Sequence, residues 1–388
     1  MITEKTKIVY AIINRSQKRR CLMKRYELSW FNDFTCLCGD CPENCCRGWV
    51  IPLSERDAIR LRQEKGWLGM LLFFATDGWT GAKFNSRSGS CLFLGRDGLC
   101  RMQKKKGHDF LPWTCQSYPR FYRNYGRFEE ACLDLSCPGA SRLFIRNNGS
   151  LEMKQCDGDP VTMPCTTNDN DELFDALLDD RSHMTAAAMS GISGELTGSL
   201  FEYAIMLQDH FAQGSDTMPD PSFGSFIKER SDAYAPLFPL GADVLLGILG
   251  TSLCHFRLRR VSPKLYRMFS SASSYLKRIK KADYPKKAAA FLDKNPLVGK
   301  TLGNYLAYYL FQYYLRAFET YSFRRQIALG IIHTNMILLL AMTRDGDVLE
   351  EDLAMIISVY NRRAFFNDTI QDEMYRIFES HFKKPDQR

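Results

Sequence analysis

The sequence lacks the patterns that mark several common classes of protein. No Gly-x-Gly-x-x-Gly follows a strand, so a Rossmann-type cofactor domain is not expected. The nearest stretch, Gly241 to Gly250, has the apolar spacing of a helix. None of the six histidines forms a His-x3-His pair. The net charge of +8 is scattered, without a basic stripe that contains interleaved aromatic residues, so we expect no nucleic-acid partner.

Long apolar segments are also scarce. The longest run, Ile327 to Met342, is interrupted by His333 and Asn335, and it is shorter than the roughly 20 residues of a membrane-spanning helix. Met1 to Arg25 contains basic residues but no apolar core before a small-residue cleavage site. We therefore expect no membrane span, no signal peptide and a cytoplasmic location, where thiols stay reduced.

Cysteine is the residue that the sequence has in excess. Ten of its 14 cysteines lie between Cys36 and Cys137, and five fall within the 11 residues from Cys36 to Cys46. A chain of 388 residues buries a core without disulfide staples. Turns at Gly39 and Pro42 allow several sulfurs to face one point. Dense thiols in a reducing compartment indicate a metal centre.

The cysteine spacing does not choose between zinc and an iron–sulfur cluster. Cys38 and Cys41 form one Cys-x2-Cys pair, but no second pair follows, as a simple zinc module would require. The order Cys38-x2-Cys41-x3-Cys45 reverses the Cys-x3-Cys-x2-Cys loop that holds a four-iron cluster in radical enzymes. Both metals stay open at this point.

Composition divides the chain into four parts. Residues 1–33 are predicted to be an N-terminal extension, 34–145 a cysteine-rich metal-binding region, 146–170 a polar linker and 171–388 a helical domain. The predicted fold class is mainly α: an irregular, metal-organised cysteine-rich N-terminal region with short strands, followed by a helical C-terminal domain.

Within the cysteine-rich region, few regular elements are expected. One helix is predicted over Leu53 to Trp67 with Ser54 as its N-cap. Hairpins are predicted around Ser90 to Cys100, with Asp97-Gly98 as the turn, and over Arg120 to Leu135. The helices predicted for the C-terminal part are 171–189, 194–212, 235–251, 263–282, 297–321, 323–343, 350–361 and 369–382.

Tyrosines are concentrated in one of these helices and just after it. Their spacing is typical of packing on one face, but the same rings can form a cage for a lysine ammonium or its methylated product. The set is Tyr305, Tyr308, Tyr309, Tyr313, Tyr314 and Tyr321.

Four cysteine motifs together resemble the flagellin lysine-N-methylase family and, more distantly, small zinc- or iron-chelating cysteine-cluster proteins. The resemblance covers most of Phe34 to Met342, with a weaker match at Asn304 to Phe311. The motifs are Phe34-x-Cys36 with Cys41-x3-Cys45-Cys46-x2-Trp49, Gly89-Ser-Cys91-Leu-Phe93-Leu94 through Asp97-Gly98-Leu99-Cys100, Leu111-Pro112-x-Thr114-Cys115-x2-Tyr118-Pro119-Arg120, and Glu130 through Leu135-Ser136-Cys137-Pro138.

The resemblance implies a metal site and an activity. The implied ligands are Cys36, Cys41, Cys45, Cys46, Cys91, Cys100, Cys115 and Cys137. Cys38 and Cys132 are departures from the family pattern. The implied activity is methyl transfer from S-adenosylmethionine to surface lysines of flagellin, with a four-iron cluster (4Fe-4S). A cluster iron that chelates the methionyl end would replace the missing Rossmann domain.

Further residues are candidates for cofactor binding and proton transfer. Arg120, directly after Tyr118-Pro119, can hold the carboxylate of S-adenosylmethionine with two hydrogen bonds, so both Arg120 and Tyr118 are predicted to bind the cofactor. A lysine must lose a proton before transfer, and Asp134, Glu129 and Glu130 are open candidates for the base. The alternative functions are a non-enzymatic zinc- or iron-binding module with a helical interaction domain, and an electron-transfer protein.

Overall fold

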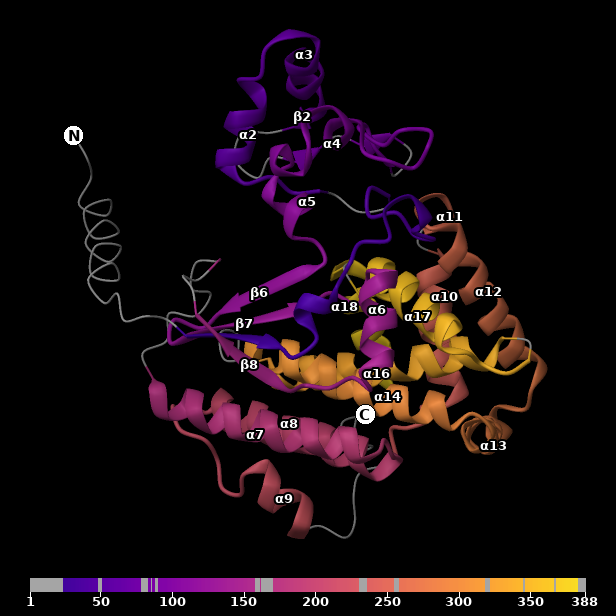
Figure 1. Cartoon of the computed structure of the whole chain (residues 1–388). Coiled ribbons are helices and arrows are strands. Elements are labelled where there is room, and N and C mark those ends of the chain that lie inside the picture. Colours follow the sequence, from indigo (N-terminus) through magenta and orange to yellow (C-terminus); the bar gives the residue numbers. More distant parts are fainter. Residues whose placement is uncertain are drawn as a thin grey trace.

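The computed structural model describes most of the chain as a helical body that carries a small sheet and a separate lobe (Figure 1). The described residues are 24–47, 51–77, 83–84, 86–87, 90–157, 161, 170–229, 236–254, 258–317, 322–344, 346–365 and 368–382. This architecture confirms the predicted fold class.

The lobe, built from residues 51–117, has its own hydrophobic core. Leu61, Leu72, Phe84, Phe93 and Met102 are buried in it, and Cys91, Cys100 and Cys115 pack against it. Its elements are α2 (Glu55–Arg62), α3 (Gly66–Ala75), β2 (Thr76–Asp77), β3 (Lys83–Phe84), β4 (Ser86–Arg87), β5 (Ser90–Cys91), α4 (Arg101–Lys106), η3 (His108–Phe110) and α5 (Trp113–Ser117). The lobe therefore brings three predicted ligands to the edge of a packed unit.

A four-stranded sheet joins the lobe to the body. Its strand order is β6 (Arg120–Asn124), β7 (Phe128–Leu133), β1 (Lys24–Leu28) and β8 (Met153–Cys156). β1 runs parallel to β7, and the other neighbours are antiparallel. The hairpin of β6 and β7 confirms the predicted hairpin from Arg120 to Leu135. A Rossmann domain has a doubly wound, mostly parallel sheet, whereas this sheet has one parallel pair of strands. No Rossmann domain is found among the described residues.

The helices of the body share one large core with the sheet. α14 and α16 are almost entirely buried, as expected for helices in the centre of a core. The helices are α6 (Pro138–Arg146), α7 (Asp171–Ser190), α8 (Gly194–Ala212), α9 (Phe223–Glu229), α10 (Ala242–Cys254), α11 (Leu258–Val261), α12 (Pro263–Arg278), α13 (Tyr284–Lys294), α14 (Pro296–Tyr313), α16 (Phe323–Met342), α17 (Glu350–Tyr360) and α18 (Asp368–His381).

Short 3-10 and π turns complete the body. They are η1 (Phe31–Asp33), η2 (Cys38–Asp40), η4 (Lys281–Asp283), η5 (Tyr314–Arg316) and the π-helical η6 (Asn361–Phe365). The helix predicted from Leu53 to Trp67 instead ends at Arg62, and α3 begins at Gly66, whose φ of +73° breaks a continuous helix. Ser54 is the N-cap, as predicted, because its side chain accepts a hydrogen bond from the Asp57 N–H.

The apolar run that was predicted to be too short for a membrane is part of a longer helix. α16 has 20 residues and is long and apolar enough to cross a membrane by length and composition. However, 89% of its most apolar window is buried inside the protein. Its hydrophobicity is therefore accounted for by packing in the core.

A buried ion pair ties the sheet to two helices. Arg181 on α7 donates to both carboxylate oxygens of Glu130 on β7, at 2.6 and 2.9 Å, and to the carbonyl of Phe311 on α14. Both charged side chains are at most 9% exposed. A bidentate, desolvated pair of this kind fixes the geometry of the elements that carry it.

We expect Glu130→Gln to lower the free energy of unfolding by about 3–5 kcal/mol, because it leaves the Arg181 charge buried without its partner. Chemical denaturation followed by circular dichroism measures this loss. The matched control is Glu373→Gln, which removes the exposed pair with Arg376 and should change stability by less than about 1 kcal/mol. Equal effects of the two substitutions would contradict the structural role of Arg181.

Candidate metal centre

Backbone pairing brings the N-terminal cysteine loop, Cys36–Arg47, against the lobe. The Cys91 N–H donates to the Cys46 carbonyl at 2.8 Å, and Arg47 pairs with Ser90 in an antiparallel bridge. The side chain of Asn44 accepts from the Cys46 N–H at 2.8 Å and donates to the Gly98 carbonyl at 2.5 Å. The loop is thereby fixed beside the turn that was predicted at Asp97-Gly98.

The predicted hairpin from Ser90 to Cys100 folds back as expected. Leu94 pairs with Cys100 in an antiparallel bridge, and the Gly95 N–H donates to the Leu99 carbonyl at 2.7 Å. Gly98 has a φ of +77°, which a residue without a side chain adopts readily. The turn places Cys91 and Cys100 next to each other on the side of the cysteine loop.

Cys45 is the common neighbour of the predicted ligands. Its thiol is hydrogen-bonded to that of Cys46, and its charge interacts with those of Cys36, Cys41, Cys91 and Cys115. The other two predicted ligands interact with neighbours of Cys45 rather than with Cys45 itself. Cys100 interacts with Cys46, and Cys137 interacts with Cys41. These interactions link the eight predicted thiols in pairs, and their role as ligands stays a prediction.

The two extra thiols differ in their positions. Cys132 is only 3% exposed and points into the core of the body, where Glu130 and Arg181 are its charged neighbours. Cys38 lies in the cysteine loop, next to Cys36, with a φ of 48° that is unusual for a residue with a side chain. Cys132 is thereby separated from the other thiols, whereas Cys38 is not.

Burial and mutual repulsion control the protonation of these thiols. Burial raises the pKa of Cys91 to about 11 and that of Cys137 to about 12, with neighbouring thiols adding to the effect. The hydrogen bond from Cys46 lowers the pKa of Cys45 to about 7. A bound cation would stabilise the thiolate forms that this environment otherwise disfavours.

The donor set fits a thiolate-ligated metal or cluster, although the side chains do not converge in ligand geometry. Within the described part of the chain, no three or more His, Cys, Asp or Glu side chains are already arranged to hold a metal ion. The eight thiols are more than a single tetrahedral zinc or one four-iron cluster needs. Sulfur-only donors are compatible with either.

A buried arginine from the far end of the chain holds the cysteine loop in place. Arg362 on η6 donates to the carbonyls of Glu43 and Asn44 at 2.8 and 2.9 Å. The same guanidinium donates to the Ser136 carbonyl at 2.8 and 3.2 Å and to the Tyr118 hydroxyl at 3.2 Å. One side chain therefore joins three cysteine-bearing segments. Sequence motifs did not single it out.

Arg363 places a second buried positive charge beside the first. Its Nη2 donates to the Arg47 carbonyl at 2.9 Å, whereas its Nη1 is buried without a hydrogen-bond partner. Burial and the neighbouring Arg362 charge lower the pKa of Arg363 to about 10. Two adjacent buried cations favour a net negative charge nearby, which a thiolate-ligated iron–sulfur cluster would carry.

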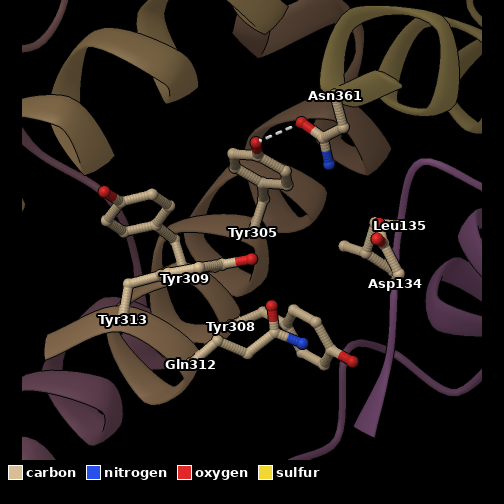
Figure 2. A pocket seen from close by; sticks show the side chains of 8 residues that line it. All are labelled: Asp134, Leu135, Tyr305, Tyr308, Tyr309, Gln312, Tyr313 and Asn361. Atoms are coloured by element: carbon tan, nitrogen blue, oxygen red, sulfur yellow. Dashed lines mark hydrogen bonds between the residues drawn. The ribbon is translucent and has the colours of Figure 1, made fainter. Parts of the chain in front are cut away.

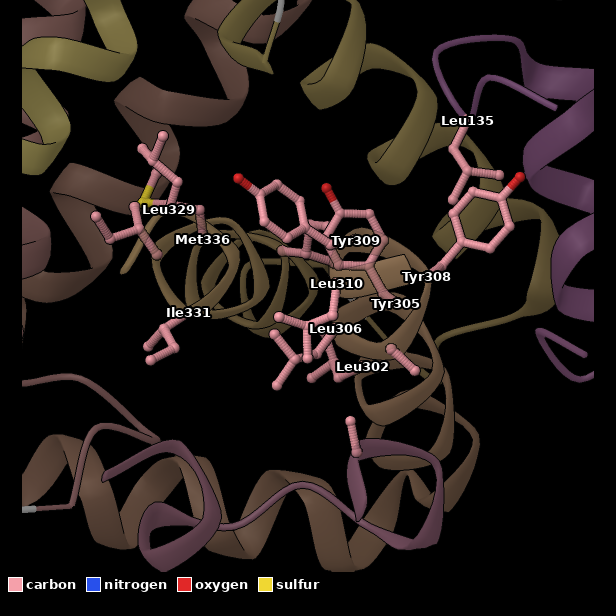
Figure 3. Packing of buried hydrophobic residues seen from close by; sticks show 14 of the residues in the cluster. Leu135, Leu302, Tyr305, Leu306, Tyr308, Tyr309, Leu310, Leu329, Ile331 and Met336 are labelled. Carbon is pink, nitrogen blue, oxygen red and sulfur yellow. The ribbon is translucent and has the colours of Figure 1, made fainter. Parts of the chain in front are cut away.

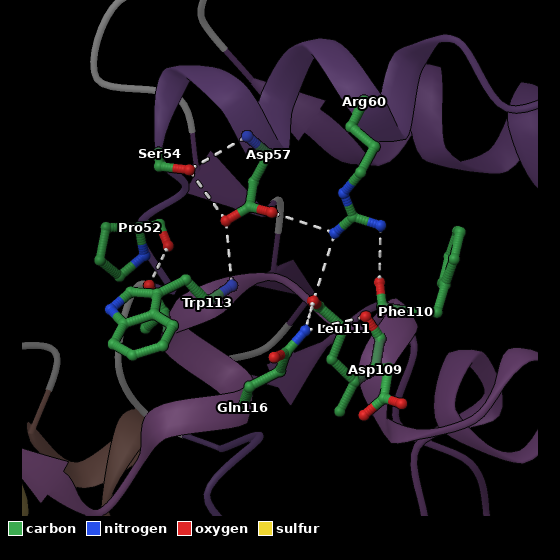
Figure 4. Close-up of polar contacts among 10 residues, drawn as sticks. Pro52, Ser54, Asp57, Arg60, Asp109, Phe110, Leu111, Trp113 and Gln116 are labelled. Atoms are coloured by element: carbon green, nitrogen blue, oxygen red, sulfur yellow. Dashed lines mark hydrogen bonds and ion pairs between the residues drawn. The ribbon is translucent and has the colours of Figure 1, made fainter. Parts of the chain in front are cut away.

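A polar network in the lobe positions Cys115 (Figure 4). The carboxylate of Asp57 accepts from the Trp113 N–H at 2.9 Å and from Arg60 at 3.0 Å. Arg60 also donates to the carbonyls of Phe110 and Leu111. Burial raises the pKa of Asp57, but the hydrogen bonds from Trp113, Arg60 and Ser54 outweigh it and bring the pKa below its usual value. The first turn of α5 is thereby anchored to α2.

The two residues predicted to bind the cofactor, Arg120 and Tyr118, have different neighbours. The Arg120 guanidinium lies over the rings of Phe31 and Phe34, 5.6 and 5.5 Å from their centroids. It has no carboxylate partner among the described residues. Tyr118 bonds to the Ser136 hydroxyl at 2.9 Å and to Arg362. Their cofactor role stays a prediction.

Four of the predicted tyrosines line a cavity in the body (Figure 2). They follow one another at helical spacing on α14, and Figure 3 shows Tyr305, Tyr308 and Tyr309 packed in the core with leucines of the same helix. Tyr314 is buried in the core, and Tyr321 is outside the described residues. The cavity is lined by Asp134, Leu135, Tyr305, Tyr308, Tyr309, Gln312, Tyr313 and Asn361.

The structure separates the three acids that were candidates for the base. Glu130 is engaged by Arg181, and Glu129 by Arg25 at 3.0 Å and by the Val161 N–H. Asp134 has no ion-pair partner among the described residues and lines the tyrosine cavity. Burial raises the pKa of its carboxyl group. Asp134 is thus the acid that can interact with an incoming group.

The fold and the site define a mainly helical protein with a lobe that contains several cysteines. Comparison of its sequence with those of known proteins identifies its family. The chain is 30% identical to the flagellar biosynthetic protein FliU of Salmonella muenchen over 137 residues, which span 33% of this chain and 80% of FliU. It is 29% identical to a lysine-N-methylase of Salmonella choleraesuis (strain SC-B67) over 139 residues, and 27% identical to that of Salmonella typhimurium (strain LT2).

The chain belongs to the family of FliU and these lysine-N-methylases, which confirms the resemblance seen in the cysteine motifs. The match spans 33% of this chain and about a third (34%) of the two lysine-N-methylases. No family model matches the sequence. No solved structure matches the fold.

We expect Arg362→Lys to loosen the cysteine loop, because an ammonium cannot replace the guanidinium bonds to Glu43, Asn44 and Ser136. In metal-free, reduced protein, maleimide labelling of Cys45 and Cys46 should accelerate about tenfold, which corresponds to the loss of one or two charged hydrogen bonds. Peptide mass spectrometry measures the rates. Arg325→Lys, at an exposed pair with Asp372, is the matched control. Unchanged labelling in the Arg362 variant would refute the clamp.

Asp57→Asn should destabilise the protein by about 1–2 kcal/mol at pH 7 through loss of the charged bonds. Because the folded state lowers the pKa of Asp57, its contribution is present above the unfolded pKa of about 3.9 and is lost as the pH falls through the lower folded value. The difference between the variant and the natural chain should therefore shrink below about pH 4. Denaturation at several pH values tests this, with the exposed Asp109→Asn as control.

Proposed function

We propose that this protein is a lysine N-methyltransferase that moves a methyl group from S-adenosylmethionine to surface lysines of flagellin and depends on a cysteine-ligated iron–sulfur cluster. The observation that carries the proposal is the set of five thiols that interact with Cys45, in a chain whose relatives are named lysine-N-methylase and flagellar biosynthetic protein. The names of the relatives support lysine methylation, and the thiol-only donor set supports a cluster.

The reaction sets clear requirements for the site. Methyl transfer forms a bond between the lysine Nζ and the methyl carbon and breaks the bond from that carbon to sulfur, whose electron pair stays on S-adenosylhomocysteine. The amine must be neutral when it attacks, so one proton leaves the lysine nitrogen. The protein must therefore hold a sulfonium cofactor, admit a lysine and accept a proton.

The candidate ligands of the cluster are the eight predicted cysteines, from which four would be used. If these thiols hold a four-iron cluster, it would supply a Lewis-acidic iron for binding the methionyl end of the cofactor. Arg120, which lies beside Phe34 at the start of the cysteine loop, can hold the carboxylate. Arg362 stabilises negative charge at Cys41 and Cys45 by direct electrostatic attraction.

The proposed partner and location follow from the same chemistry. Flagellin subunits carry the surface lysines, and the reduced thiols need a reducing compartment such as the cytoplasm. The alternative is a zinc-binding module without transferase activity, since four of the thiols also satisfy tetrahedral zinc.

Purification without oxygen tests the proposal. We expect about four irons and four sulfides per chain, a visible absorption that changes when S-adenosylmethionine is added, and methylated lysines in flagellin by mass spectrometry. Cys45→Ser should abolish the cluster and the transfer, because Cys45 is the common neighbour of the thiols. Cys254→Ser, at an exposed cysteine on α10, should retain both.

Two outcomes would contradict the proposal. A colourless protein with stoichiometric zinc and no effect of S-adenosylmethionine would support the zinc module instead. An intact cluster without methyl transfer to flagellin would leave an electron-transfer protein or a different substrate.

A further inference from the structure

We propose that the tyrosine cavity is the binding site for the ε-ammonium group of the substrate lysine, with Asp134 as its counter-ion. This assignment rests on the proposed function, because it names the subsite that the methylated residue occupies. The cavity has aromatic walls, one carboxylate, the size of an ammonium group and a position next to the cysteine-bearing segments.

The walls of the cavity are aromatic faces of the kind that attract cations. Tyr305, Tyr308, Tyr309 and Tyr313 come from successive turns of α14, and the rings of Tyr309 and Tyr313 lie 5.1 Å apart at 32°. The hydroxyl of Tyr309 is directed to α16, where it donates to the Gln326 side-chain oxygen at 3.5 Å, so this residue offers its ring rather than its hydroxyl. Such π faces stabilise an ammonium group most strongly where water is excluded.

The facing wall supplies a negative charge. Asp134 comes from the segment that follows β7, on the other side of the cavity from the α14 tyrosines (Figure 2). One of its carboxylate oxygens accepts from the Ser136 N–H at 2.8 Å. The Arg362 guanidinium acts on this carboxylate through its charge, but within the described residues no cation forms a direct ion pair with it. A partly buried acid among aromatic rings is suited to an external cation.

The cavity also contains a polar side chain that can bond to an incoming group. Gln312 is 8% exposed, and its Nε2 has no hydrogen-bond partner of standard geometry, although the amide lies near the Cys132 thiol. Rotation of the amide by half a turn would present its oxygen as an acceptor instead. The hydroxyls of Tyr305 and Tyr308 are already used, by Asn361 and by the Leu133 carbonyl.

The size of the cavity favours a primary ammonium group over larger cations. Its volume is about 20 Å³, which accommodates about one water-sized group. An ammonium group is of that size, whereas a sulfonium with three carbon substituents or a planar guanidinium is larger. The cavity is therefore suited to lysine rather than to the sulfonium of the methyl donor or to arginine.

The cavity is linked to both the surface and the cysteines. Asp134 and Tyr313 are half-buried, whereas the other lining residues are buried, so the cavity lies nearest to the surface at these two residues. The Asp134 carbonyl accepts from the Cys137 N–H at 3.1 Å, and Asn361 directly precedes the clamp residue Arg362. The two segments that form part of the cavity wall thus also hold the cysteine loop.

Binding of a lysine analogue to the oxygen-free, metal-replete protein tests the assignment without any methyl donor. The probes are N-acetyl-lysinamide and its neutral counterpart N-acetyl-norleucinamide, titrated by ligand-observed NMR. We expect the lysine analogue to bind at least about tenfold more tightly, because only its ammonium meets the carboxylate and the ring faces.

Two variants separate the contribution of the carboxylate to lysine binding from that of the aromatic rings. Asp134→Asn, which is nearly isosteric, should weaken binding of the lysine analogue about tenfold and leave the norleucine analogue unaffected. Tyr313→Leu should weaken lysine binding about fivefold through loss of a ring face. Tyr275→Leu, at a half-buried tyrosine of α12, is the matched control and should bind as the natural chain does.

The outcomes separate this inference from the proposed function. Equal binding of the two analogues, or unchanged lysine binding in Asp134→Asn, would overturn the cavity as an ammonium site even if methyl transfer to flagellin is observed. Selective lysine binding that Asp134→Asn abolishes would support the site even if flagellin is not the substrate. Circular dichroism of each variant confirms that it is folded before binding is compared.

Discussion

The bonds of Arg362 and Arg363 to the cysteine loop are the interaction on which the arrangement of the site depends. The two arginines lie in a π-helical turn more than 300 residues away from the loop in sequence, yet they hold the carbonyls of Glu43, Asn44 and Arg47. A guanidinium with five donors can join several carbonyls at once, which a lysine cannot do. The C-terminal part of the chain thereby fixes where the N-terminal thiols lie.

This constraint makes the lobe and the body parts of one site. Each has its own hydrophobic core, and the predicted ligands are divided between them: Cys91, Cys100 and Cys115 pack against the lobe, and Cys137 belongs to the body. The buried pair of Glu130 and Arg181 keeps the sheet in register with α7 and α14. A centre that uses ligands from both parts would couple metal binding to their packing.

The same frame connects the proposed cofactor region to the proposed lysine site. The segment from Asp134 to Cys137 has a cavity-lining acid at one end and a predicted ligand at the other. In the same way, Asn361 lines the cavity and the next residue, Arg362, bonds to the cysteine-bearing segments. A rigid connection of this kind sets the distance between two reactants, which is a principal source of rate enhancement in group transfer.

Much of this molecule was predictable from local sequence. The cysteine motifs indicated the family, Ser54 indicated a helix N-terminus, and apolar periodicity indicated most of the C-terminal helices, because these features depend on neighbours within a few residues. The break at Gly66 and the strands Lys24–Leu28 and Met153–Cys156 were not foreseen. Tertiary structure alone decided that Arg362 and Arg363 meet the cysteine loop, that Glu129 and Glu130 are paired with arginines, and that Asp134 faces the tyrosines. Those contacts join residues far apart in the chain, and only packing of the whole core brings them together.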